Sequence, residues 1–341
     1  MLCKPERRAR VTATLLPVLV LWLLRAAPAT ALELALPIDC EVGQDCWLVN
    51  VVDLDPGRGV LDHACTSFTY DGHKGTDIAI RDLKAMDAGV SVLSSAPGTV
   101  RAVRDGMDDI DFTERGKDSV RGRECGNGVV IDHGRGWLTQ YCHMKKGSIL
   151  VKQGVTVTMG QRLGLVGHSG LAQFPHVHLE VRHNNEVIDP FVGSGPGTTC
   201  GSRKGSIWRK EAGQQLGDMP TAIFNAGFAA IRPQTVAVRA GLYHDGVLSR
   251  QVPALVLWAD IYWPLAGDEL RMRIFGPDGA VVYEHANPVV KTQARKLFYA
   301  GRNRPALFWP AGRYRGEITL TSGAGSQTAL MQKVERTVIL R

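Results

Sequence analysis

Three observations predict a mainly β protein. Between His73 and residue 192, short apolar runs alternate with glycines, as in half-buried strands joined by tight turns. The same region shows no convincing amphipathic helix of about twelve residues. From residue 235 onward, about seven strand-like segments fall within about 110 residues, a density typical of an immunoglobulin-like β-sandwich. The length that follows residue 31, about 310 residues, favours two domains.

The first 31 residues are predicted to be an export signal. A basic start precedes an apolar run, Val11–Leu24, and residues 29–31 (Ala-Thr-Ala) fit a small-residue cleavage site. The run has about 14 residues, fewer than the roughly 20 that cross a bilayer. We therefore favour cleavage before Leu32 over a retained anchor. The expected product is exported, periplasmic or extracellular, and has no membrane span after cleavage.

The charge of the chain argues against a nucleic-acid partner. The formal net charge is +7, but residues 1–31 hold five Lys or Arg and one Glu, so +4 leaves with the signal and +3 remains. A balance this mild does not make the basic surface that nucleic-acid binding needs.

Cysteine usage fits export. Six cysteines follow the signal, and an even number in an exported chain indicates disulfides: Cys40, Cys46, Cys65, Cys125, Cys142 and Cys200. Most of the pairing stays open, but one pair can be argued. Segments 128–133 and 137–141 form a predicted hairpin around a Gly-Arg-Gly turn, which places Cys125 almost opposite Cys142. A structural zinc site is disfavoured because no C-x-x-C spacing occurs.

The chain divides into five predicted parts. After the signal come a cysteine-rich lead (32–69), a first domain (70–192), a linker rich in Gly, Ser, Thr and Lys (193–214) and a second domain (215–341). In the first domain the predicted strands beside the hairpin are 89–94, 98–104, 148–152, 156–158, 162–166, 177–182 and 187–188. In the second they are 235–243, 254–262, 270–275, 280–285, 294–299, 312–321 and 333–340. A polar insertion, Asp105–Glu124, is predicted to be a solvated loop, and loops of this length are often functional.

Two histidine motifs predict a metal site in the first domain. His73 and Asp77 form an H-x-x-x-D, and His176 and His178 form an H-x-H. On a strand, side chains two residues apart face the same side, so both imidazoles of the H-x-H can serve one site. Two imidazoles and a carboxylate suit a catalytic zinc with an open position for water. His143, at the end of a predicted strand, is a third element of this pattern. By contrast, no cluster of catalytic side chains stands out in the second domain.

These motifs, with three further blocks, resemble the lysostaphin/LytM-type zinc metallopeptidases. The blocks are His73–Asp77, Tyr141–Met144, Val151–Gly154, Gly160–Gly167 and Pro175–Glu180, in the family's order over about residues 70–192. The resemblance implies an antiparallel β-sheet core with an open groove and hydrolysis of peptide bonds in peptidoglycan stem peptides through a zinc-bound water. It implies Zn²⁺ ligands at His73, Asp77 and His178, and catalytic roles for His143 and His176.

The sequence leaves two other functions open. A relative without catalysis would bind the wall or activate a hydrolase, and degenerate relatives usually lose ligands, whereas all five positions are present here. A zinc peptidase that cuts proteins is the other alternative, because substrate choice depends on loops. The sequence leaves the role of the second domain open, and binding of a protein partner is one candidate role.

Overall fold

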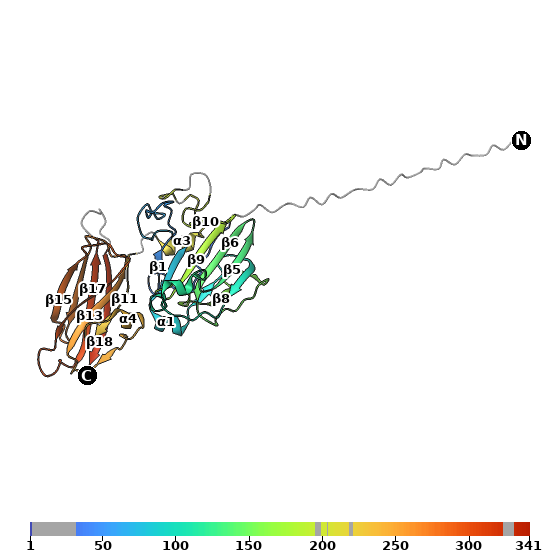
Figure 1. The fold of residues 1–341 in the computed structure, drawn as a ribbon. Coiled ribbons are helices and arrows are strands. Elements are labelled where there is room, and N and C mark those ends of the chain that lie inside the picture. The colour runs from blue at the N-terminus through green and yellow to red at the C-terminus, as the bar shows by residue number, and fades with distance from the viewer. Residues whose placement is uncertain (2–31, 195–198, 203, 218–220, 323–330) are drawn as a thin grey trace. The chain divides into compact units, whose positions relative to one another are not determined.

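The computed structural model describes residues 1, 32–194, 199–202, 204–217, 221–322 and 331–341 (Figure 1). The predicted export signal lies outside these residues, apart from Met1. None of the helices in this described part has the length and apolar composition that a membrane crossing needs.

An antiparallel sheet forms the first part of the fold. Its strands lie in the order β1-β2-β9-β6-β5-β4-β7, and β10 pairs with β9. Their bounds are β1 Cys46–Asn50, β2 Thr76–Ile80, β4 Gly98–Arg104, β5 Asn127–Gly134, β6 Trp137–Met144, β7 Thr156–Val157, β9 His176–His183 and β10 Glu186–Ile188. Two further strands, β3 (Ser91–Leu93) and β8 (Arg162–Leu165), pair separately. Valine, isoleucine and leucine side chains of these strands form one buried core, as the apolar runs predicted.

Helices are short throughout the described residues. They are α1 Leu83–Ala88, α2 Phe112–Arg115, the 3₁₀ helix η1 Lys117–Val120, α3 Lys210–Leu216 and α4 Thr235–Arg239. Asp82 caps α1 by accepting a hydrogen bond from the backbone N–H of Ala85. Helix α2 and η1 lie within the polar insertion. Trp208 and Ala212 of the predicted linker, and Leu216 just after it, pack into the core of the first sheet.

Two packed sheets form the C-terminal part. One has the order β11-β13-β16 and the other β12-β18-β17-β14-β15, and a second hydrophobic core draws residues from both. The bounds are β11 Ala222–Ala229, β12 Val247–Leu248, β13 Ala254–Tyr262, β14 Glu269–Phe275, β15 Val281–Pro288, β16 Arg295–Asn303, β17 Gly312–Thr321 and β18 Met331–Leu340. This arrangement is a β-sandwich. Its likeness to immunoglobulin domains remains a prediction.

A third hydrophobic cluster joins the two parts. Trp47 and Val49 from β1 and Phe68 from the lead pack with Phe224, Tyr262 and Trp263 of the sandwich. The indole N–H of Trp263 donates to the carbonyl of Val49. Elsewhere His244 Nε2 lies 2.7 Å from Asp82 Oδ2. The C-terminal part is therefore packed against the strand that borders β2.

Two predicted strands are wrong, and one strand of the structure was not predicted. Residues 235–243 were expected to be a strand, but they begin with α4, in which Val236 is exposed and Val238 buried. A helix of five residues is too short to show its periodicity in sequence. Residues 148–152 are not a strand, and Leu150 there is exposed. Strand β11 was missed because its continuous run of small and apolar residues lacks the alternation of a half-buried strand.

Among the described residues, the cysteines form three disulfides. The bridge between Cys125 and Cys142 confirms the pair that the hairpin predicted. Cys40 is bonded to Cys46, and Cys65 to Cys200. The last bridge ties the cysteine-rich lead to the segment that follows the first sheet.

Candidate metal centre

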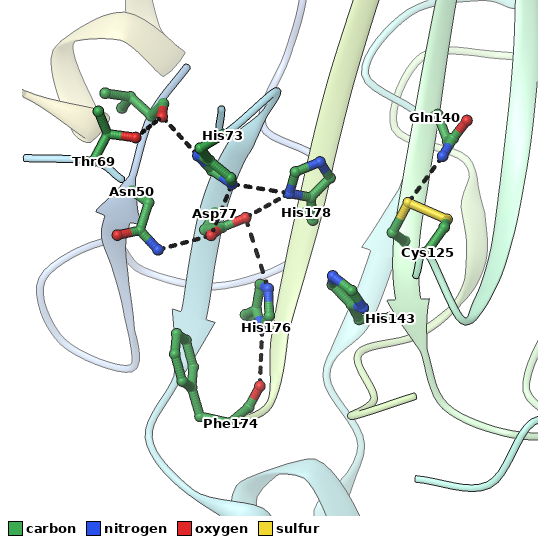
Figure 2. Close-up of polar contacts among 12 residues, drawn as sticks. Asn50, Thr69, His73, Asp77, Cys125, Gln140, His143, Phe174, His176 and His178 are labelled. Carbon is green, nitrogen blue, oxygen red and sulfur yellow. Dashed lines mark hydrogen bonds and ion pairs between the residues drawn. A yellow bond between two sulfur atoms is a disulfide. The ribbon is translucent and has the colours of Figure 1, made fainter. Parts of the chain in front are cut away.

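Adjacent antiparallel strands hold two of the three predicted ligands, and the loop before β2 holds the third. Asp77 on β2 lies directly opposite His178 on β9, and Ala79 lies opposite His176. Residues opposite each other in such a pair project from the same face of the sheet, and so does the residue two positions along the strand. His73 precedes β2 and reaches the same point from the loop (Figure 2). The structure therefore brings together the side chains of both histidine motifs.

The ligand atoms of His73, Asp77 and His178 lie within 4.8 Å of one another. Nε2 of His73 is 3.2 Å from both Asp77 Oδ2 and His178 Nδ1, and His178 Nδ1 is 2.8 Å from Asp77 Oδ1. Two imidazole nitrogens and one carboxylate oxygen thus point at one small volume. This is the donor set that a catalytic zinc uses, and the residues present fit a metal ion.

Neighbouring groups fix two of these side chains. His73 Nδ1 donates to the carbonyl of Val51 at 2.6 Å, which leaves Nε2 as the nitrogen with the lone pair. Asn50 Nδ2 donates to Asp77 Oδ2 at 2.8 Å. Both partners belong to β1 or follow it directly, so the cysteine-rich lead orients the ligands. The carboxylate of Glu180, two residues beyond His178 on β9, pairs with Arg182 instead.

Gly75 is required at the site for space. A Cβ atom there would lie 2.5 Å from His178 Nε2 and 2.8 Å from the carbonyl oxygen of Leu179. The reason is the close approach of the His178 ring, which any side chain at this position would displace.

His143 and His176 form a second pair beside the first group. Their ring centroids are 4.6 Å apart, and His176 Nε2 lies 3.7 Å from Asp77 Oδ1. Each donates its Nδ1 proton to a backbone carbonyl, His143 to Ser169 at 2.7 Å and His176 to Phe174 at 2.8 Å. In both rings Nε2 is then the nitrogen that can accept a proton.

A left-handed backbone conformation sets the direction of His143. Its φ is 59°, which L-residues rarely adopt. Successive residues of a regular strand face opposite sides, yet Cys142 and His143 both line the same cavity. The amide of His143 donates to the carbonyl of Cys125 at 2.8 Å, next to the Cys125–Cys142 disulfide. The hairpin bridge therefore braces the unusual backbone at this histidine.

Burial and neighbouring charges shift the pKa values of the histidines and the aspartate at this site. Burial lowers the pKa of His143 well below its ordinary value, and the adjacent His176 and His178 lower it further. Burial also lowers the pKa of His176. Burial alone would raise the pKa of Asp77, but the nearby His73 and His176 and the hydrogen bond from His178 outweigh it and hold this pKa well below its usual range. Near pH 7 the site thus holds an ionised carboxylate beside two neutral imidazoles.

Two cavities meet at these residues. The groove cavity, of about 590 Å³, is lined on one side of the site by Gly72, Lys74, Arg104, Glu124, Gln140 and Arg182. The arginine cavity, of about 330 Å³, is lined on the other side by Asn50, Phe112, Lys117, Phe174, Arg239, Tyr262 and Arg295. Tyr70, His143, Leu171 and His178 line both. The polar insertion borders both cavities through Lys117 and Glu124.

No pattern in the sequence indicated that several of these residues belong to the site. Asn50 lies in the cysteine-rich lead and Tyr70 at the start of the first domain, and no motif marks either residue. Arg239, Tyr262 and Arg295 belong to the C-terminal part, in which we had found no catalytic cluster. The arginine cavity is built from both parts of the chain, and no local spacing in the sequence could reveal it.

Comparisons with known proteins agree with this geometry. Residues 71–190 match the model of Peptidase family M23. Over 129 residues the chain is 32% identical to an uncharacterized metalloprotease of Haemophilus influenzae, a match that covers 38% of this chain and 22% of the relative. Over 109 residues it is 37% identical to the peptidoglycan DD-endopeptidase ShyA of Vibrio cholerae, covering 32% of this chain and 20% of the relative. The matches span about a fifth of the length of these relatives.

A solved structure gives a similar match. It is a mutant catalytic domain of the prophage-encoded M23 protein EnpA from Enterococcus faecalis, with 24% sequence identity and a TM-score of 0.31. The match covers 44% of this chain and 92% of that one. The family match confirms the resemblance drawn from the motifs, and residues 71–190 form a domain of Peptidase family M23.

Proposed function

We propose that this protein is an exported zinc metalloendopeptidase that hydrolyses peptide bonds in peptidoglycan crosslinks. One observation carries the proposal. His73, Asp77 and His178 converge within 4.8 Å, and two further imidazoles stand beside them with Nδ1 fixed on backbone carbonyls. The match to a peptidoglycan DD-endopeptidase supports the substrate class, and the disulfides support an oxidising compartment.

In this proposal His73, Asp77 and His178 would hold the metal. Zinc, when bound, supplies a Lewis acid that activates water near neutral pH and polarises a carbonyl. The contacts from Val51 to His73 and from Asn50 to Asp77 keep the ligand atoms aimed at one point. The single carboxylate leaves a net charge of +1 on the loaded site.

His143 and His176 would move the protons. Both rings are neutral near pH 7 and present Nε2, so either can accept the proton of the attacking water. A bond forms between the water oxygen and the carbonyl carbon, and the bond from that carbon to the amide nitrogen breaks. The proton then passes from the imidazole to the leaving amine. Two histidines thus take the role that a glutamate has in H-E-x-x-H enzymes.

The test is hydrolysis of purified peptidoglycan. The purified protein should release new free amines from peptidoglycan, a chelator should stop the release, and added zinc should restore it. Folded protein with zinc bound that releases no amine would favour a non-catalytic wall-binding relative. Release of amines from unfolded proteins, with none from peptidoglycan, would favour a zinc peptidase that acts on proteins.

A further inference from the structure

We propose that Arg239 and Arg295 form a carboxylate-binding subsite in the arginine cavity, which holds a free carboxylate of the peptide beside the bond to be cut. The proposal rests on the function given above and names a feature of its substrate. It also gives the C-terminal part a direct role in substrate binding.

The arginine cavity has an excess of positive charge. Three cations line it, Lys117, Arg239 and Arg295, against one carboxylate, Asp77, which is directed to the metal site. His176 lines the same cavity, so a group bound there would lie next to the reacting bond. Asp260 pairs with Arg295 and Asp111 lies 3.6 Å from Arg239, but neither carboxylate lines the cavity. An anion that enters would therefore meet arginine N–H groups in a partly buried site, where electrostatic attraction is stronger than in bulk water.

Arg295 is held rigidly at this position. Its Nε and Nη2 atoms donate to both carboxylate oxygens of buried Asp260 at 2.6–3.1 Å. The guanidinium also lies over aromatic rings, 4.8 Å from the centroid of Phe224 and 5.5 Å from that of Tyr262. Among the hydrogen bonds of the described residues, Nη1 of Arg295 has no partner. A rigid donor loses little conformational entropy when a ligand binds.

Arg239 has no equally good partner. Its Nη1 lies 3.6 Å from Asp111 Oδ2, and its Nε is buried without a hydrogen-bond partner in the described structure. Burial and the neighbouring charge of Arg295 lower the pKa of Arg239. The hydroxyl of Tyr262, which lines the same cavity, is likewise buried without a partner.

Structural ion pairing accounts for only part of this arrangement. Asp260 satisfies most of the guanidinium of Arg295. It does not explain why a second arginine lies within electrostatic reach with a buried, unpaired N–H. Buried polar groups are nearly always hydrogen-bonded in folded proteins, so the unpaired Nε and the Tyr262 hydroxyl point to a missing acceptor. A carboxylate offers two acceptor oxygens and the matching charge.

The test compares two short alanine tripeptides, one with a free C-terminal carboxylate and one with a C-terminal amide. Calorimetry with the purified protein in chelator prevents turnover and prevents the carboxylate from binding metal. We expect the carboxylate peptide to bind roughly tenfold more tightly. Arg239→Gln should abolish this preference and leave the affinity for the amide unchanged. Arg295→Lys, which keeps the charge but loses the planar fork, should reduce it.

The matched control is Arg232→Gln. Arg232 stacks on Tyr299 and does not line the cavity, so the preference should persist. Melting temperatures verify that each variant is folded. Equal affinity of the wild-type protein for the two peptides, or a preference that survives in Arg239→Gln, would overturn the subsite. Inorganic phosphate is a third probe, and tighter Arg239-dependent binding of phosphate than of the carboxylate peptide would overturn the carboxylate assignment.

Measurements of hydrolysis distinguish a failure of this subsite from a failure of the proposed function. On crosslinked peptides, Arg239→Gln should raise KM about tenfold for substrates with free carboxylates, with kcat nearly unchanged, and should leave amidated substrates unaffected. If the wild-type protein prefers the carboxylate peptide but cuts no peptidoglycan, the subsite stands and the function fails. If it cuts peptidoglycan regardless of amidation and of Arg239, the function stands and the subsite fails.

Discussion

Asp77 and His178 lie directly opposite each other on β2 and β9, with Asp77 Oδ1 2.8 Å from His178 Nδ1. This cross-strand pair is the centre of the site. Its position depends on strand register, because a slip of one residue would turn one of the two side chains to the other face of the sheet. The first prediction follows from this pair.

Removing any of the proposed ligands should remove bound metal. We expect His73→Ala, Asp77→Ala and His178→Ala each to lose most zinc, because three protein ligands are the usual number at a catalytic zinc. Metal analysis of the purified proteins is the measurement. His285→Ala, which changes an exposed histidine on β15, is the control and should keep its zinc. Full zinc in His178→Ala would refute the ligand assignment.

Loss of either histidine that we propose to transfer protons should abolish catalysis without abolishing metal binding. His143→Ala and His176→Ala should keep zinc but lose about 10²–10⁴-fold in turnover, the usual contribution of acid–base groups. The measurement is the rate of amine release from peptidoglycan beside metal content. Near-normal turnover in one variant would show that its histidine has no role in proton transfer.

The stabilisation by each disulfide should increase with the length of the loop that it closes. Their sequence separations are 6, 17 and 135 residues for Cys40–Cys46, Cys125–Cys142 and Cys65–Cys200. On the chain-entropy model, replacing each pair by serine should cost about 2, 3 and 5 kcal/mol of unfolding free energy. Denaturant unfolding measures these costs. The Cys125–Cys142 variant should also lose activity, because that bridge braces the backbone at His143. Full activity in this variant would contradict the bracing role.

Stability should fall between about pH 4 and pH 7 because of Asp189. Burial raises the pKa of this carboxyl to about 7, while its ordinary value is near 3.9. In that interval the folded protein holds a proton that the unfolded chain releases, so this contribution is full below about pH 4 and is lost as pH rises through 7.

Asp189→Asn should remove this dependence. Asparagine retains an oxygen for the backbone N–H of Phe191, which Asp189 Oδ1 accepts at 2.6 Å. At pH 8 the variant should melt several degrees above the wild type, since each kcal/mol is worth roughly 2–4 °C in a chain of this size. At pH 4 the two should melt together. Asp71→Asn, at an exposed aspartate, is the control. A wild-type excess in melting temperature at pH 8 would contradict the prediction.

Much of the site follows from the sequence because its geometry is local. The period of two in a strand puts His176 and His178 on one face, and the hairpin turn puts Cys125 opposite Cys142. The motif blocks indicated the family and the position of the candidate metal site. Apolar runs and glycine spacing gave most strands of both parts. The short helix α4 was missed because five residues show no helical period.

Only the tertiary structure decided the rest. The left-handed backbone at His143 depends on its contact with Cys125 across the hairpin, and no residue type in the motif demands it. Arg239, Tyr262 and Arg295 reach the site because a shared hydrophobic cluster packs the sandwich against β1. Side-chain direction along one strand is fixed by local covalent geometry. Which surfaces of two separate sheets meet is fixed by the burial of apolar side chains distant in sequence, and no local pattern encodes it.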